Sequence, residues 1–139
     1  RSIVRWKGER AAKAHTKWWN TVVSAAKQSR RSRIPTVYDL HSTPELAELI
    51  AEVRAQGAAV FILHEQASER LTTLLGQSAG ERLGEIYLVV GPEGGISERE
   101  VEMFTQAGAS LALLGTEVLR SSTAGSAGLC AVNIALGRW

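Results

Sequence analysis

Ile86–Gly95, with the sequence IYLVVGPEGG, is an apolar run that stops at a glycine-rich loop. Five consecutive aliphatic, β-branched or aromatic residues predict a strand that is covered on both faces, as in a parallel sheet. The glycines of the loop let the backbone approach a flat ligand, and Pro92 stiffens the turn. Ser97–Glu100 has the pattern of a capping box, which predicts a helix that Gly108 ends. A plain tight turn is the alternative interpretation of the loop, but its unpaired acid, Glu93, favours a site.

Leu111–Ser126, with the sequence LALLGTEVLRSSTAGS, repeats this design. An apolar run again stops at a glycine, Gly115, and a short segment leads to an apolar helix expected from about Thr123 to Leu136. Arg120 is permanently charged and lies between a strand and that helix. It therefore requires an anionic or carbonyl partner, unless it is a plain surface arginine. We expect the two stretches to form one site.

The middle of the chain predicts ordinary α/β structure. Thr43–Gly57 is expected to be a helix, because Thr-Pro opens it and glycine ends it. Ala58–Leu63 is predicted to be the next buried strand. His64 follows it, at the edge of the sheet where the ligand-binding loops of open sheets usually lie. His64 is more readily interpreted as a hydrogen-bonded strand end than as a catalyst. Gln66–Gly84 is polar and partly helical, and the alternation of helices and strands predicts an α/β sheet with parallel pairing.

Basic residues gather at the N-terminal end of the chain. Residues 1–33 contain ten Lys or Arg and a single acid, which is typical of a protein that binds a polyanion. Glu9–Ser29 has the periodicity of an amphipathic helix, and a short strand is expected to begin at Thr36–Tyr38. Trp18 and Trp19 cannot both point inward, so one can be exposed, with packing in the core as the favoured interpretation.

Several classes of protein are excluded or disfavoured by composition. Cys130 is the single cysteine, which excludes an intrachain disulfide, and the three histidines are scattered, so no metal site is expected. The 139 residues are enough for one domain with a sizeable core. The sequence has no signal peptide and no apolar run of membrane-spanning length, which favours a cytoplasmic protein. Because the chain starts at Arg1 and not at methionine, we expect it to be a trimmed piece.

Two blocks carry a resemblance to a known family. VGPEGGISEREVEMF (residues 90–104) followed by LLGTEVLRSSTAGSAGL (residues 113–129) is similar to the signature pair of the bacterial small-subunit ribosomal RNA uracil-N3 methyltransferases, in the knotted SPOUT superfamily. KWWNTVVSAAKQSRRSRIPTV (residues 17–37) extends the resemblance to nearly the whole chain. The two blocks together are specific, whereas either alone would be weak. One departure is Ser121-Ser122, where the pattern has threonine or serine followed by glutamate.

The resemblance implies the finer features of the fold. It implies that residues 1–139 form a single SPOUT methyltransferase domain, with a parallel sheet flanked by helices. It also implies a deep C-terminal trefoil knot, formed by the chain from Ile86 onward, and a homodimer. The N-terminal RNA-binding barrel domain of full family members is expected to be absent from this chain.

The resemblance further implies a reaction and the residues that serve it. The cofactor would be S-adenosylmethionine, and the reaction would be methylation of N3 of a uracil in 16S ribosomal RNA, as bare RNA or within the small ribosomal subunit. Glu93 would act as the base or orient it, and Arg120 would stabilise the developing negative charge. The residues implied in cofactor binding are Leu63, Val90, Gly91, Gly94, Gly95, Leu114, Gly115, Val118, Leu119 and Thr123.

RNA binding is assigned to the basic segment that follows the first helix, and the residues implied in it are Gln28, Arg30, Arg31 and Arg33. Two other functions stay open at this point. One is ribose 2′-O methylation of RNA by a member of the same superfamily. The other is a non-catalytic RNA-binding module that uses the basic helix alone.

Overall fold

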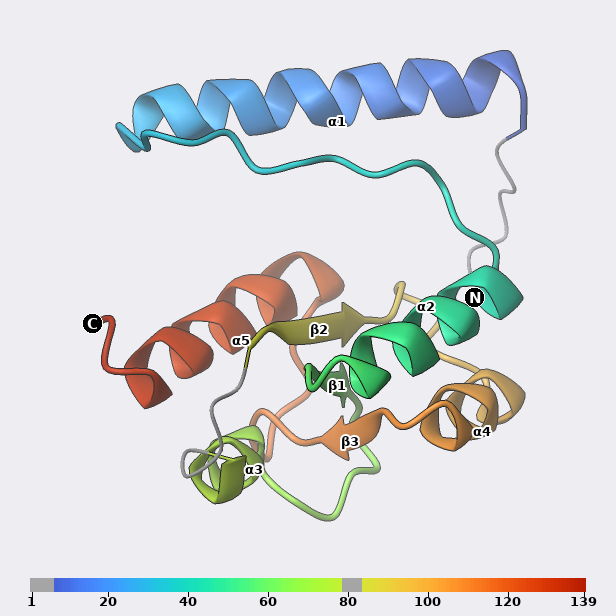
Figure 1. The fold of residues 1–139 in the computed structure, drawn as a ribbon, viewed down its shortest axis with the longest axis vertical. Helices are drawn as coiled ribbons and strands as arrows, with labels where there is room; N and C mark the ends of the chain where they lie inside the picture. Colours follow the sequence, from blue (N-terminus) through green and yellow to red (C-terminus); the bar gives the residue numbers. More distant parts are fainter. Residues whose placement is uncertain (1–6, 79–83) are drawn as a thin grey trace. The chain divides into compact units, whose positions relative to one another are not determined.

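The computed structural model describes residues 7–78 and 84–139. The chain divides into two compact units, with the boundary between Ser42 and Thr43. Figure 1 shows the elements of each unit. Within the described ranges, no helix combines the length and the apolarity needed to cross a membrane.

The N-terminal unit consists of one long helix and an extended segment. Helix α1 (Glu9–Gln28) matches the amphipathic helix expected from the sequence. After a reversal at Arg30, which has a φ of 52°, the chain runs back beside α1 (Figure 1). The His15 ring contacts the carbonyl oxygen of Val37 through Nε2 at 3.0 Å. The prediction of a strand at Thr36–Tyr38 was wrong, because this extended segment pairs with no described strand.

The two adjacent tryptophans of α1 are both exposed. Trp18 is 61% exposed and Trp19 is 41% exposed, so the expected packing of one of them in the core was also wrong. A single extended segment covers only one side of a helix, and Ala26 is the one described residue of α1 that is buried. The prediction of an apolar stripe on α1 was confirmed, but the periodicity of the sequence does not show how much of this stripe other residues cover.

The C-terminal unit is a parallel α/β sheet. In chain order its elements are α2 (Thr43–Ala55), β1 (Ala59–Leu63), α3 (Leu71–Ser78), β2 (Ile86–Val90), α4 (Glu98–Gln106), β3 (Ser110–Ala112) and α5 (Ser121–Ala135). The strand order is β2-β1-β3, and both pairings are parallel. In the register, Leu63 lies opposite Val90 on one side and Ala112 on the other. The three strands therefore end in one row.

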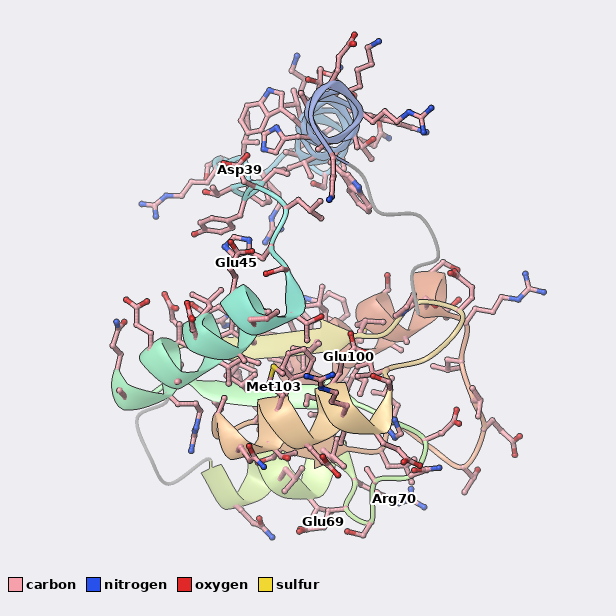
Figure 2. All side chains as sticks on the ribbon, turned by 90° about the vertical axis from the view of Figure 1, so that its right-hand side faces the viewer. Asp39, Glu45, Glu69, Arg70, Glu100 and Met103 are labelled. Carbon is pink, nitrogen blue, oxygen red and sulfur yellow. The ribbon has the colours of Figure 1, made fainter. Side chains whose placement is uncertain are left out.

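Helices cover both faces of the sheet. Helices α2 and α4 pack together on one face, and α3 and α5 pack together on the other, as Figures 1 and 2 show. Val60 and Ile62 of β1 belong to the core under α2 and α4, whereas Ala59 and Phe61 belong to the core under α3 and α5. This alternation confirms the sequence prediction of a parallel sheet covered on both faces.

Helix α5 lies very close to the sheet. A Cβ atom on Gly128 would be 3.0 Å from Cδ1 of Leu88 and 3.1 Å from Cδ1 of Leu63. On Gly125, one turn earlier, it would be 3.8 Å from its nearest neighbour, a methyl group of Val90. The absence of a side chain at Gly128 therefore sets the close approach of α5 to the sheet.

We expect Gly125→Ala and Gly128→Ala to have different effects on stability. Alanine favours a helix over glycine by about 1 kcal/mol, and at Gly125 there is room for the methyl group, so Gly125→Ala is expected to raise the free energy of unfolding. At Gly128 overpacking costs about 1–3 kcal/mol, which offsets that gain. Urea denaturation of both variants measures the difference. Equal stability would contradict the close packing of α5.

Candidate functional site

A cleft opens at the edge of the sheet where the three strands end. It has a volume of about 1700 Å³ and is lined by the segments that follow β1, β2 and β3, together with the starts of α4 and α5. Ligand pockets usually measure about 300–1,000 Å³. The cleft is therefore large enough for a cofactor-sized ligand and part of a second molecule.

The loop after β2 forms the first wall of the cleft. A Cβ atom on Gly91 would be 2.9 Å from Cγ1 of Ile96, so the two ends of the loop lie close together and a side chain at position 91 would force Ile96 to shift. The Gly95 N–H donates to the carbonyl oxygen of Pro92 at 2.8 Å, and Gly95 has a φ of 72°, which other residues rarely adopt. Glu93 is exposed at the tip of this loop and lines the cleft.

The end of the same loop is fixed by the capping box predicted from the sequence. The hydroxyl and the N–H of Ser97 both donate to Oε2 of Glu100, at 2.7 and 3.0 Å. The hydroxyl of Thr43, on α2, donates to Oε1 of Glu100 at 3.0 Å. These hydrogen bonds, those from Ser97 above all, lower the pKa of Glu100.

The contribution of these hydrogen bonds to stability depends on pH. It is complete above the pKa of Glu100 in the unfolded chain, about 4.3, and is lost as the pH falls through the lowered pKa of the folded chain.

The segment after β3 forms the second wall. A Cβ atom on Gly115 would meet nothing within 4 Å, so its backbone borders open space. Val118 is 74% exposed and Leu119 is 40% exposed, and both line the cleft. Exposed apolar side chains within a cleft are typical of a wall that an apolar part of a ligand covers.

The N-terminus of α5 faces the same cleft. Arg120 is the N-cap residue of the helix and has an extended conformation, and its side chain makes no capping hydrogen bond. The first turn contains no acid, and Ser121 and Ser122 line the cleft with Arg120. The first N–H groups of a helix have no acceptor within it and favour negative charge, as does the guanidinium group. Helix α5 begins at Ser121, two residues before the expected start, and this places its N-terminus at the cleft.

The end of β1 forms the floor of the cleft with Leu63 and His64. The His64 N–H donates to the carbonyl oxygen of Ala112 at 3.0 Å, and His64 Nδ1 accepts from the N–H of Gln66 at 3.2 Å. His64 is therefore a hydrogen-bonded residue at the end of a strand, which is the interpretation that the sequence favoured. With Nδ1 as acceptor, a neutral ring carries its proton on Nε2.

The structure brings most of the sequence-predicted site residues together. Glu93 and Arg120 both line the cleft. So do nine of the ten residues expected to bind a cofactor, which are Leu63, Val90, Gly91, Gly94, Gly95, Leu114, Gly115, Val118 and Leu119. Thr123 is the exception: it is exposed in the first turn of α5, where its N–H donates to the carbonyl oxygen of Arg120 at 2.8 Å.

Sequence reasoning missed the acidic lining of the cleft. Its carboxylates come from all three segments and from α4, and they are Glu65, Glu93, Glu98, Glu102 and Glu117. Among the described residues, the arginines that line it are Arg99 and Arg120. Only Glu93 stood out in the sequence, because the others occupy positions where a solvent-exposed acid is ordinary. For Glu65 and Glu117, placement after a strand end was the available signal.

The residues expected to bind RNA lie in the N-terminal unit. Gln28 is the last residue of α1, and Arg30, Arg31 and Arg33 follow it. All four are exposed. No acid among the described residues lies within ion-pair distance of these arginines. Their charge is therefore available to a ligand.

Comparison with known proteins gives a family match and curated relatives. A family model described as an RNA methyltransferase domain matches residues 1–133. The chain is 45% identical over its whole length to ribosomal RNA small subunit methyltransferase E of Mycobacterium bovis, of which it covers 52%. It is 29% identical to the protein of the same name from Bacillus subtilis, with 96% of the chain and 52% of that protein covered. The chain thus spans about half the length of these relatives.

Solved structures agree with these relatives. The ribosomal RNA small subunit methyltransferase E of Neisseria gonorrhoeae, bound to S-adenosylmethionine, is 29% identical with a TM-score of 0.73, and covers 96% of this chain and 51% of its own. A Legionella pneumophila protein in complex with the bound cofactor S-adenosylmethionine is 26% identical with a TM-score of 0.82, and covers 97% of this chain and 52% of its own. With the family match, these likenesses confirm the resemblance seen in the sequence blocks: the chain belongs to the RNA methyltransferase domain family.

Proposed function

We propose that this chain is the catalytic part of an S-adenosylmethionine-dependent methyltransferase that modifies N3 of a uracil in small-subunit ribosomal RNA. The observation that carries the proposal is the meeting of the Gly91–Gly95 loop and the Gly115–Arg120 segment around one cleft, in a chain of this family. The names of the curated relatives and the cofactor bound in the Neisseria structure support it.

The residues of the cleft fit this cofactor. Open backbone at Gly115 and exposed apolar side chains at Val118 and Leu119 suit an adenine ring. Among the described residues, the cleft is lined by five carboxylates and two arginines, and this excess of negative charge suits a ligand with a positive charge. When bound, the cofactor would supply an activated methyl group on its sulfonium, so the chain itself would have to prepare only the acceptor.

Two residues of the cleft would prepare the acceptor. Uracil N3 is a weak nucleophile while it keeps its imide proton, so the site needs a proton acceptor and a stabiliser for the resulting charge on O2 and O4. We assign the first role to Glu93, as the base or the group that orients it, because it lies at the tip of the loop in the cleft. Arg120 and the N-terminus of α5 would stabilise the charge.

The basic N-terminal unit would hold the RNA. Arg30, Arg31 and Arg33 are exposed and have no acidic partner among the described residues, so they can neutralise phosphates. Such contacts position RNA but carry no base specificity. Choice of the target would then depend on the cleft and on parts of the enzyme outside this chain.

We also propose the finer fold features implied by the resemblance. The family model spans residues of both units, which supports a single SPOUT domain over residues 1–139. Leu129 and Ile134 on α5, and Leu136 just after it, are exposed apolar side chains and suit a homodimer interface. A C-terminal trefoil knot from Ile86 onward remains a prediction from the resemblance. Light scattering measures the oligomeric state directly.

We expect Gly115→Val to weaken binding of S-adenosylmethionine by about tenfold or more, because the side chain enters open space beside the ligand without strain in the protein. Gly76→Val is the matched control: Gly76 lies in α3, outside the cleft, and a Cβ atom there also meets nothing within 4 Å. Calorimetric titration measures both affinities. Equal binding by the two variants would place the cofactor elsewhere.

Glu93→Gln is expected to lower methyl transfer to small ribosomal subunits by about 100-fold or more, the usual size of general-base catalysis, with little change in cofactor affinity. Glu52→Gln on the exposed face of α2 is the control. Mass analysis of the modified nucleoside separates methylation of N3 from methylation of the ribose. Comparable losses of transfer and of cofactor affinity would remove the chemical role of Glu93.

Replacement of Arg30, Arg31 and Arg33 by glutamine is expected to weaken binding of single-stranded ribosomal RNA. The slope of log affinity against log salt should become shallower by about 0.7 for each phosphate that the variant no longer neutralises. Fluorescence anisotropy at several salt concentrations measures both effects, and cofactor binding serves as the internal control. An unchanged salt slope would assign the RNA binding to other residues.

A further inference from the structure

The loop after β2 needs support from outside itself. Residues 92–95 are exposed at its tip and line the cleft, so no core packing fixes their positions. At its start, Gly91 lies so close to Ile96 that a Cβ atom there would clash with it, and Ile96 packs against the core under α2 and α4. How firmly the chain is held at Ile96 and just after it therefore contributes to the position of the tip.

Glu100 holds the chain just after Ile96. Its Oε2 atom accepts the N–H of Ser97 at 3.0 Å and the hydroxyl of Ser97 at 2.7 Å. The N–H of Glu100 in turn donates to Oγ of Ser97 at 3.4 Å. These three hydrogen bonds form the capping box, and by themselves they stabilise only the first turn of α4.

The second oxygen of Glu100 reaches a different part of the chain. Oε1 accepts the hydroxyl of Thr43, the first residue of α2, at 3.0 Å. Figure 2 shows Glu100 on α4, on the face of the sheet that α2 also covers. The capping of α4 does not need this long-range hydrogen bond. The hydrogen bond connects the end of the loop to a second helix, α2.

The location of the carboxylate keeps it charged and ordered. It lies in the first turn of α4 and beside the first residue of α2, and the N-termini of helices favour negative charge. The hydrogen bonds from Ser97 and then from Thr43 lower its pKa, so it stays ionised near neutral pH. An ionised acceptor makes stronger hydrogen bonds than a neutral one.

We propose that Glu100 is a positioning residue for the cofactor loop: its carboxylate bridges Ser97 and Thr43 and so fixes residues 92–95 in the shape that binds the cofactor. The cofactor part of this inference rests on the proposed function, whereas the fixing of the loop does not. Loss of the bridge leaves α4 capped but lets the loop move relative to α2.

The test uses variants of Thr43, because they leave the capping box intact. Thr43→Val keeps the shape of the side chain and removes the hydroxyl, and Thr43→Ser restores it. Thr105→Val is the matched control, since the hydroxyl of Thr105 bonds only within α4, to the carbonyl oxygens of Val101 and Glu102.

Two measurements are made on each variant. Amide hydrogen exchange without cofactor follows residues 94–96, and calorimetric titration gives the affinity for S-adenosylmethionine. For Thr43→Val we expect faster exchange confined to this loop and affinity lower by about threefold to tenfold, the effect of removing one hydrogen bond. Thr43→Ser and Thr105→Val should resemble the unmodified chain.

The outcomes separate this inference from the proposed function. Exchange that matches Thr105→Val, or that increases over the whole chain and not in the loop, would overturn the positioning role. If the unmodified chain does not bind S-adenosylmethionine, the proposed function fails, and the exchange measurement alone then decides whether Glu100 positions the loop. Faster loop exchange with unchanged affinity would overturn the link to the cofactor.

Discussion

Parallel pairing of β1 with both of its neighbours is the constraint on which the cleft depends. In this register Leu63, Val90 and Ala112 end in one row, so three segments leave the sheet at the same edge. Parallel strands require crossovers, and here the crossover helices cover both faces of the sheet. The core packing that stabilises the sheet therefore also brings together the two glycine loops, although they are separated along the chain by the whole of α4 and β3.

The chemistry at this edge comes from backbone as much as from side chains. The close approach of Ile96 favours glycine at position 91, and a positive φ favours it at position 95. Gly115 leaves a stretch of backbone open to the cleft. Glu93 and Arg120, from two different segments of the lining, add one negative and one positive charge. Because the walls follow different strands, the relative position of these two charges depends on the sheet and on the anchoring of each loop, Glu100 included.

Much of this arrangement could be predicted from the sequence, because its signals are local. The unbroken apolar run of β2, the capping box at Ser97 and the glycine stop at Gly108 each reflect neighbouring residues, and each was confirmed. The parts that failed or were missed depend on partners far along the chain. The exposure of Trp18 depends on what covers α1, and the hydrogen bond between Thr43 and Glu100 joins residues separated by 57 positions. Periodicity carries no information about either.

The exposed apolar wall at Val118 and Leu119 has a thermodynamic consequence. These side chains follow the last strand and are exposed to solvent, whereas the apolar side chains of the strands are covered by helices. A ligand that covers these side chains removes apolar surface from water. The unfolded chain does not form the cleft and so does not bind this ligand. Ligand binding and folding are thus linked: a ligand at 100 times its dissociation constant adds about 2.7 kcal/mol to the free energy of unfolding, without any change in the protein's internal packing.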